Sequence, residues 1–127
     1  MVRTILIGPD LVFGQEILKA LDAERFPVTV AMWMLQKEQS EDWELVISTP
    51  LYDQLGAAKA YDRLIKIMSG KCSSLVSEIP IRLESNRRPF IRALRKGYRT
   101  VPSDGMRLRT RYLGDTFIDD GYVYRVK

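Results

Sequence analysis

Apolar residues recur with the period of an α-helix in three parts of the chain. Residues 8–25 begin with Gly-Pro-Asp, a common helix start, and Pro27 then requires an extended backbone before it. Residues 57–70 carry apolar side chains on one arc and charged side chains on the opposite arc, and Gly70 is a typical helix end. A third amphipathic segment begins at Pro89 and runs to about Arg99. The pattern therefore predicts three helices.

Other stretches have the pattern of β-strands. Residues 28–36 are apolar on both faces, which predicts a central strand covered on both sides, and the polar residues 37–42 separate it from a returning strand at 43–49. Residues 78–85 are a third strand, with Pro80 at its start or at a sheet edge. Residues 106–112 alternate strictly, and residues 116–127 are also β in character. Within the last stretch, periodicity leaves open whether Asp120-Gly121 is a hairpin turn or a bulge.

The order of these elements predicts an α+β fold. We expect a single domain, residues 1–127, with a mixed sheet of about five strands, β-hairpins at both ends and three flanking helices. The composition, 46% apolar and 28% charged, is typical of an ordered globular protein. We found no membrane span or signal peptide in the sequence and expect a cytoplasmic protein.

The composition also limits the chemistry. The sequence contains no histidine, which removes Ser-His-Asp and Cys-His catalysis and imidazole metal ligation. The single Cys72 excludes an internal disulfide and a cysteine-rich zinc site. We therefore expect no cofactor, and catalysis is less favoured than binding.

Five segments occur in the order FPVTVAMWML, WELVISTPLYD-x-x-G, AYDRL, PFIRALR and IDDGYVYRV. In this order they resemble a group of short bacterial proteins to which no activity is assigned. The resemblance extends from about Leu18 to Val126. The resemblance implies a bacterial single-domain α+β protein. It implies no activity, cofactor or catalytic residue, so functional expectations rest on the residues themselves.

The charge is distributed unevenly along the chain. Residues 1–63 hold 6 Lys or Arg against 10 Asp or Glu, whereas residues 64–127 hold 14 against 6. The halves can attract each other or neighbouring molecules, or the basic half can meet an acidic protein or nucleic acid.

Two groups of cations lie in the basic half. On a helical wheel one group forms a single stripe between residues 88 and 99 with no intervening acid, and the other alternates along the strand at 106–112. The candidate polyanion-binding residues are Arg88, Arg92, Arg95, Lys96, Arg99, Arg107, Arg109 and Arg111. If both groups share a face, they can hold a nucleic-acid backbone with little regard to sequence. The alternatives are a solvated face, cations paired with acids of the same molecule, and a site for a small anion. Tyr98 and Tyr112 fall on the apolar side of their elements, so we expect them in the core.

A group of carboxylates gives a third, weaker alternative. Asp115, Asp119 and Asp120 could supply oxygen ligands to a metal ion in a hydrolase. In a regular strand, however, Asp120 would be partly buried and would need an arginine partner, for which Arg82 and Arg109 are the candidates. Structural pairing is therefore the preferred interpretation.

The sequence thus predicts a non-enzymatic interaction module. We expect it to self-associate as a homo-oligomer, with a dimer as the simplest order, because its sheet has edges and its halves carry opposite charge. Sequence-independent binding of nucleic acid or another polyanion is the second hypothesis, and a carboxylate–metal hydrolase is the third.

Overall fold

The computed structural model describes residues 5–71, 80–98 and 101–127 of the chain. The elements follow one another as α1 (Gly8–Ala23), β1 (Val30–Leu35), β2 (Glu44–Ser48), α2 (Leu51–Leu55), α3 (Ala57–Lys71), β3 (Ile81–Glu84), α4 (Pro89–Gly97), β4 (Met106–Leu113) and β5 (Thr116–Val126). They form a single α+β domain with a mixed five-stranded sheet, as the sequence predicts. The short helix α2 was not predicted.

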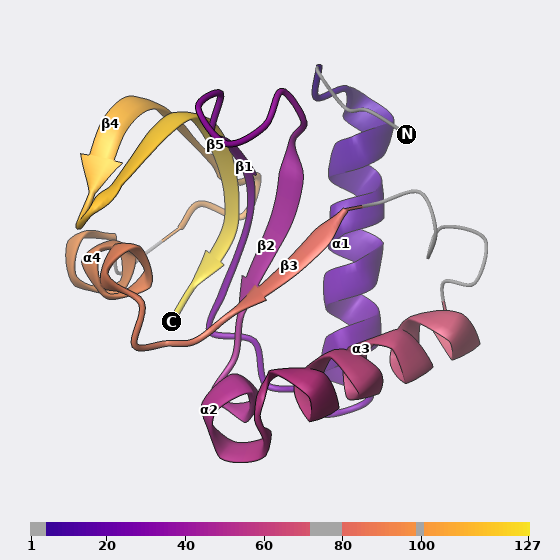
Figure 1. Ribbon diagram of the computed structural model, residues 1–127. Helices are drawn as coiled ribbons and strands as arrows, with labels where there is room; N and C mark the ends of the chain where they lie inside the picture. Colours follow the sequence, from indigo (N-terminus) through magenta and orange to yellow (C-terminus); the bar gives the residue numbers. More distant parts are fainter. Residues whose placement is uncertain (1–4, 72–79, 99–100) are drawn as a thin grey trace.

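The strands are arranged in the order β3-β2-β1-β5-β4 (Figure 1). β1 and β2 form one antiparallel hairpin and β4 and β5 form the other, which confirms the hairpins predicted at both ends. β3 pairs with β2 in parallel, and the connection between them passes through α2 and α3. β1 is the central strand, and all six of its residues are buried.

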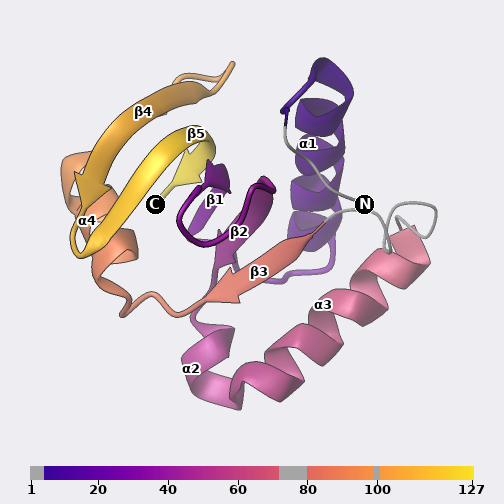
Figure 2. The same cartoon turned by 45° about the horizontal axis from the view of Figure 1, so that its top comes forward.

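The helices divide between the two faces of the sheet. Alternate residues of β1, including Ala31 and Trp33, belong to a core shared with α1 and α3. The intervening residues, including Met32 and Met34, belong to a second core shared with α4. Figures 1 and 2 show the same division, with α4 beside the curved β4–β5 hairpin and with α1 and α3 across the sheet from it.

Local sequence explains where several elements begin and end. α1 begins at Gly8, and the carboxylate of Asp10 accepts the backbone N–H of Ile7 at 3.0 Å, which satisfies one of the free amides at the helix start. β4 and β5 are joined by Gly114 and Asp115. Gly114 has a φ of 60°, which suits the first position of a two-residue type II′ turn.

The C-terminal strand is continuous, so Asp120-Gly121 is neither a hairpin turn nor a bulge. β4 pairs in regular register with both residues, Arg109 with Asp120 and Leu108 with Gly121. The register of the β1–β5 pair shifts at another place. Ala31 lies opposite Arg125 and Met32 lies opposite Val123, so β5 has one extra residue at this point.

Strict alternation fails in β4 because of Thr110. This residue has a φ of 42°, a conformation that is uncommon for a β-branched side chain. Leu108 and Leu113 are both buried although they are an odd number of residues apart, so the phase of the strand changes between them. Tyr112 is consequently 73% exposed, and its predicted place in the core is wrong. Tyr98, in contrast, packs partly buried against the core under α4, as expected.

None of the helices in the described ranges combines the length and apolar character that a membrane-spanning segment needs. The third strand begins at Ile81 among the described residues. The earlier residues of its predicted range, 78 and 79, lie outside them.

Candidate functional site

The helix α4 covers only part of its face of the sheet, and charged side chains occupy the part over β2 and β3. Arg82 lies directly opposite Val46, a residue of the core under α4, so Arg82 projects from this same face. Glu84 and Glu44 each lie two residues from this pair along their strands and therefore project from the same side. The result is a polar surface beside α4.

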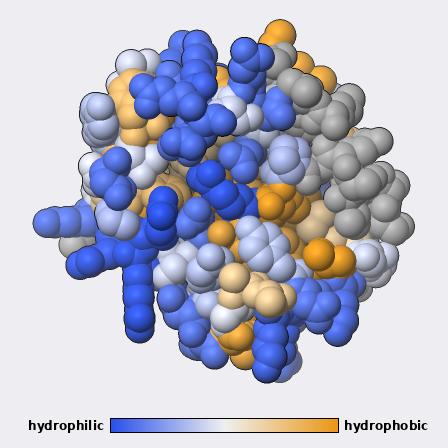
Figure 3. Space-filling view, in the orientation of Figure 1, coloured by the Kyte–Doolittle hydropathy of each residue, from blue (hydrophilic) through white to orange (hydrophobic). Residues whose placement is uncertain are grey.

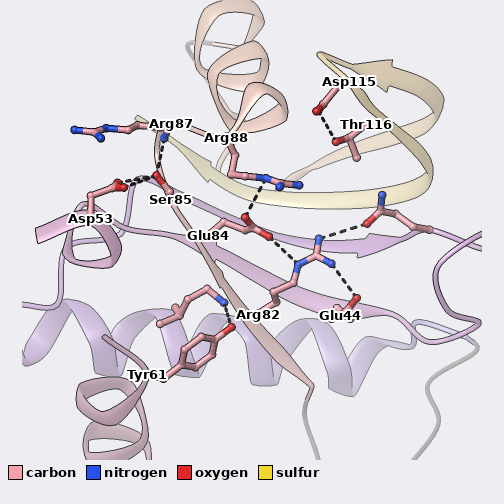
Figure 4. A network of polar contacts seen from close by, with 12 residues as sticks. Glu44, Asp53, Tyr61, Arg82, Glu84, Ser85, Arg87, Arg88, Asp115 and Thr116 are labelled. Atoms are coloured by element: carbon pink, nitrogen blue, oxygen red, sulfur yellow. Dashed lines mark hydrogen bonds and ion pairs between the residues drawn. The ribbon is translucent and has the colours of Figure 1, made fainter. Parts of the chain in front are cut away.

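Arg82 is held in place over this surface by three neighbours (Figure 4). Its Nη1 donates to Oε1 of Glu44 at 3.3 Å, its Nη2 donates to Oε1 of Gln36 at 3.4 Å, and its Nε lies 3.2 Å from Oε1 of Glu84. Gln36 in turn donates its amide to the backbone carbonyl of Phe117 on β5 at 3.3 Å. A line of polar contacts therefore crosses the sheet from β3 to β5.

Arg88, immediately before α4, shares one of these partners. Its Nε lies 3.3 Å from Oε2 of Glu84, so a single carboxylate holds two guanidinium groups (Figure 4). The loop that carries Arg88 is fixed by Ser85, whose Oγ lies 2.7 and 2.9 Å from the carboxylate oxygens of Asp53 on α2. The same Oγ accepts the backbone N–H of Arg87 at 3.0 Å. Both arginines are therefore positioned by the fold.

These side chains form one end of a polar pocket of about 470 Å³. Its lining comes from β3, the start of α4, the β1–β2 loop and the β4–β5 hairpin, and consists of Gln36, Glu38, Gln39, Arg82, Arg88, Tyr112, Asp115, Thr116, Phe117 and Asp119. In the space-filling view, hydrophilic side chains gather over the middle of the molecule, with apolar ones beside them (Figure 3). The volume lies in the usual range of small-molecule sites.

The hairpin supplies the opposite wall of the pocket. The rings of Tyr112 and Phe117 meet edge to face with their centroids 5.0 Å apart. Asp119 accepts the backbone N–H of Lys37 at 2.7 Å, and Asp115 accepts the hydroxyl of Thr116 at 3.0 Å. The pocket thus has two arginines at one end and carboxylates with an aromatic pair at the other.

The structure divides the predicted arginine row of β4. Arg107 lies opposite Tyr122, which packs against the core under α1 and α3, and Arg109 projects from the same side. Arg111 lies opposite Ile118, a residue of the core under α4, and its Nη1 donates to the hydroxyl of Tyr98. Arg107 and Arg109 therefore lie on the face opposite α4 by alternation with Leu108, and the phase change at Thr110 places Arg111 on the α4 face.

Asp120 has an arginine partner, but the partner is Arg107. Two hydrogen bonds of 2.9 and 2.7 Å join the guanidinium of Arg107 to the two carboxylate oxygens, so the predicted pairing with Arg82 or Arg109 is wrong. Burial on its own would raise the pKa of Asp120, but the hydrogen bonds and the charge of Arg107 outweigh it and hold that pKa below its ordinary value. Arg107 is thus neutralised within the chain.

The cations of α4 differ in their partners. Arg88 is paired with Glu84, and Arg95 donates through Nε to the backbone carbonyl of Lys127 at 2.7 Å. Arg92 and Lys96 are exposed, and among the described residues no carboxylate lies within ion-pair distance of either. Arg99, the last cation of the predicted stripe, lies outside the described residues.

The carboxylates proposed as metal ligands have separate roles. Within residues 5–71, 80–98 and 101–127, no group of three potential ligands is close enough to hold a metal ion. Asp115 and Asp119 line the pocket, whereas Asp120 is paired with Arg107 across the sheet. Cys72 lies outside the described residues.

No protein-family model matches the chain, and no curated protein or solved structure is similar enough to match it. The resemblance to a group of short bacterial proteins therefore stays an expectation.

The residues that form the arginine end of the pocket were largely missed from the sequence. Arg82 was considered only as a partner for Asp120, and Gln36, Glu44 and Glu84 were not singled out. One signal was present: Arg82 and Glu84 alternate with apolar residues in a short strand, which predicts two charges on one face. The parallel pairing that brings Glu44 beside them cannot be inferred from local pattern.

Proposed function

We propose that this chain is a non-enzymatic interaction module that binds an acidic group of its partner in the polar pocket. The observation that carries the proposal is the pair of arginines, Arg82 and Arg88, held side by side by Glu84 at one end of the pocket. A guanidinium group presents several N–H donors in one plane and suits carboxylate or phosphate groups. Because Glu84 occupies the Nε edge of Arg88, the outer edge of that guanidinium is left to face the pocket.

Preorganisation favours binding at this position. Arg82 is about three-quarters buried and contacts three neighbours, so little side-chain entropy remains to be lost when a ligand binds. The carboxylates of Glu44 and Glu84 hold the arginines in place, which assigns these acids a positioning role. A module that recognises a charged group needs only this geometry and no reacting residue.

The proposal is tested by nitrogen-15 NMR of the arginine side chains during titration with sodium propionate. We expect the Nε–H signals of Arg82 and Arg88 to shift in a saturable manner, and the shift of the Arg82 signal to be lost in the Arg88→Gln variant. Arg92→Gln is the matched control, because Arg92 is an exposed arginine of the same helix that does not line the pocket. Unchanged binding in Arg88→Gln, or equal loss in both variants, would contradict the proposal.

Sequence-independent polyanion binding is the second candidate function, and the exposed cations of α4 favour it. Arg87, Arg88, Arg92, Arg95 and Lys96 are all exposed, and residues 85–98 contain no acid. Arg107 and Arg109 project from the other face of the sheet, so a polyanion on α4 would not reach them. The proposed surface is therefore α4 with Arg111, a smaller set than the eight residues predicted.

Self-association also stays a proposal, and the structure limits the surfaces it can use. Pairing two copies of β4 would bring three arginines of each copy together along one pair of strands, and like charges repel. At the other edge of the sheet, the backbone N–H of Leu83 on β3 already donates to the hydroxyl of Tyr61 at 2.9 Å. A dimer would instead join the acidic end of the pocket to the basic α4 of a second copy, and light scattering at high protein concentration tests for it.

A further inference from the structure

The charges around the pocket are separated into two ends. Arg82 and Arg88 lie at the end formed by β3 and α4, whereas Glu38, Asp115 and Asp119 lie at the end formed by the β1–β2 loop and the hairpin. The arginines are already balanced by Glu44 and Glu84, and the other charged residues of the lining are all acidic. A ligand with only a negative charge would meet this excess of carboxylates. A ligand that also carries a positive charge would not.

The distance between the two ends suits a short molecule. Two strands, β2 and β1, separate β3 from β5, and neighbouring strands lie about 4.8 Å apart. The side chain of Arg82 extends over this interval as far as Gln36 at the end of β1. The remaining gap from its guanidinium to the carboxylates beside β5 is therefore one to two strand spacings, roughly 5–10 Å.

An apolar and aromatic surface lies at the carboxylate end. Tyr112 is exposed to solvent at 73%, and its ring is held edge to face by Phe117. Exposed aromatic rings attract cations through their π faces, and the attraction adds to that of nearby carboxylates. An ammonium group placed there would contact both kinds of partner, while a methylene stem would pack on the rings.

We propose that the pocket binds a small zwitterion in which a short apolar stem joins a carboxylate to an ammonium group, as in an ω-amino acid. The carboxylate pairs with Arg82 and Arg88, and the ammonium group lies among Asp115, Asp119 and Tyr112. This inference rests on the proposed binding function and adds the cationic end of the ligand. Neither end alone accounts for a lining with both signs of charge.

Three probes of matched stem length test the inference by isothermal titration calorimetry. 6-Aminohexanoate carries both charges, hexanoate carries only the carboxylate and pentylamine carries only the ammonium group. We expect 6-aminohexanoate to bind at least tenfold more tightly than either of the other two. Equal affinity for 6-aminohexanoate and hexanoate would overturn the inference, yet the anion-binding function would stand on its own titration with propionate.

Three variants assign the ends of the ligand. Arg88→Gln should weaken 6-aminohexanoate and hexanoate and leave pentylamine unchanged, whereas Asp119→Asn should weaken 6-aminohexanoate and pentylamine and leave hexanoate unchanged. The asparagine oxygen can still accept the N–H of Lys37, so the hairpin contact is preserved. Glu38→Gln, on the exposed loop, gives a second test of the acidic end and should act in the same direction as Asp119→Asn. If any of these variants weakens all three probes equally, the assignment of the two ends is wrong.

Discussion

At the scale of single residues, the packing of Gly14 shows how closely α1 approaches the sheet. Gly14 is buried, and a Cβ atom at this position would collide with the phenol ring of Tyr124. The hydroxyl of Tyr124 accepts the indole N–H of Trp33 at 2.9 Å and donates to the carbonyl of Leu11 at 2.7 Å, so the ring cannot easily move away. Burial raises the pKa of this hydroxyl above its ordinary value, which keeps it neutral and able to donate.

The change Gly14→Ala should therefore destabilise the protein, although alanine normally stabilises a helix by about 1 kcal/mol relative to glycine. We expect a loss of about 1–3 kcal/mol in the free energy of unfolding because of overpacking. Urea denaturation measures it. Gly70→Ala in α3 is the matched control, because nothing lies near a Cβ at that position, and it should be neutral or slightly stabilising. If both variants behave alike, Gly14 is not required for this packing.

The conformation of a single residue, Thr110, explains why the burial pattern of β4 differs from the one that the sequence predicts. Alternation correctly predicted that Leu108 is buried and that Arg107 and Arg109 are exposed on the other side. It could not predict that Thr110 adopts a positive φ, because threonine rarely does so and nothing local in the sequence marks it. Tyr112 consequently moved from the predicted core to the wall of the pocket.

At the scale of elements, α2 shows why the arginine end of the pocket could not be predicted. The five residues Leu51–Leu55 between Pro50 and Gly56 are too few to show a helical period. Yet α2 provides Asp53, which fixes Ser85 and with it the loop that presents Arg88. The longer elements were predictable because their periods extend over several turns or strand repeats.

The contact between α1 and β5 gives a pH-dependent prediction. Two hydrogen bonds of 2.9 and 2.7 Å from Arg125 hold the pKa of Asp22 below its ordinary value of 3.8, against the opposing effect of burial. This contribution to stability is therefore complete at neutral pH, and it is lost as the pH falls below 3.8 through the lower pKa of the folded state. Asp22→Asn should lower the free energy of unfolding at pH 7 by no more than about 1 kcal/mol, because the pair is partly exposed.

Urea denaturation between pH 7 and pH 3 checks this prediction. The Asp22→Asn variant should lose less stability than the unaltered protein over the acidic part of the range. Asp62→Asn is a suitable comparison, since its ion pair with Lys66, 2.9 Å long, lies on the exposed face of a single helix and joins no two elements. Parallel stability curves for Asp22→Asn and the unaltered protein would contradict the proposed coupling.

At the scale of the whole molecule, the uneven charge of the chain is partly balanced by folding. Asp22 and Glu44, in the acidic half, pair with Arg125 and Arg82 in the basic half. The sequence predicted this attraction as one alternative, but it could not show which cations would remain unpaired. The order of helices and strands was sufficient to predict an α+β fold with two hairpins, whereas the position of the pocket depends on the parallel pairing of distant strands.

The cations left unpaired on α4 give the last prediction. If α4 binds nucleic acid, affinity for DNA of unrelated sequences should fall steeply with salt, because each phosphate contact releases a counterion. Arg92→Gln should then reduce the slope of log K against log salt concentration by about one. Arg109→Gln removes the same charge on the opposite face of the sheet and should leave the slope unchanged. Fluorescence anisotropy with labelled DNA measures both, and an equal effect of the two changes would mean that net charge, rather than the α4 surface, governs the interaction.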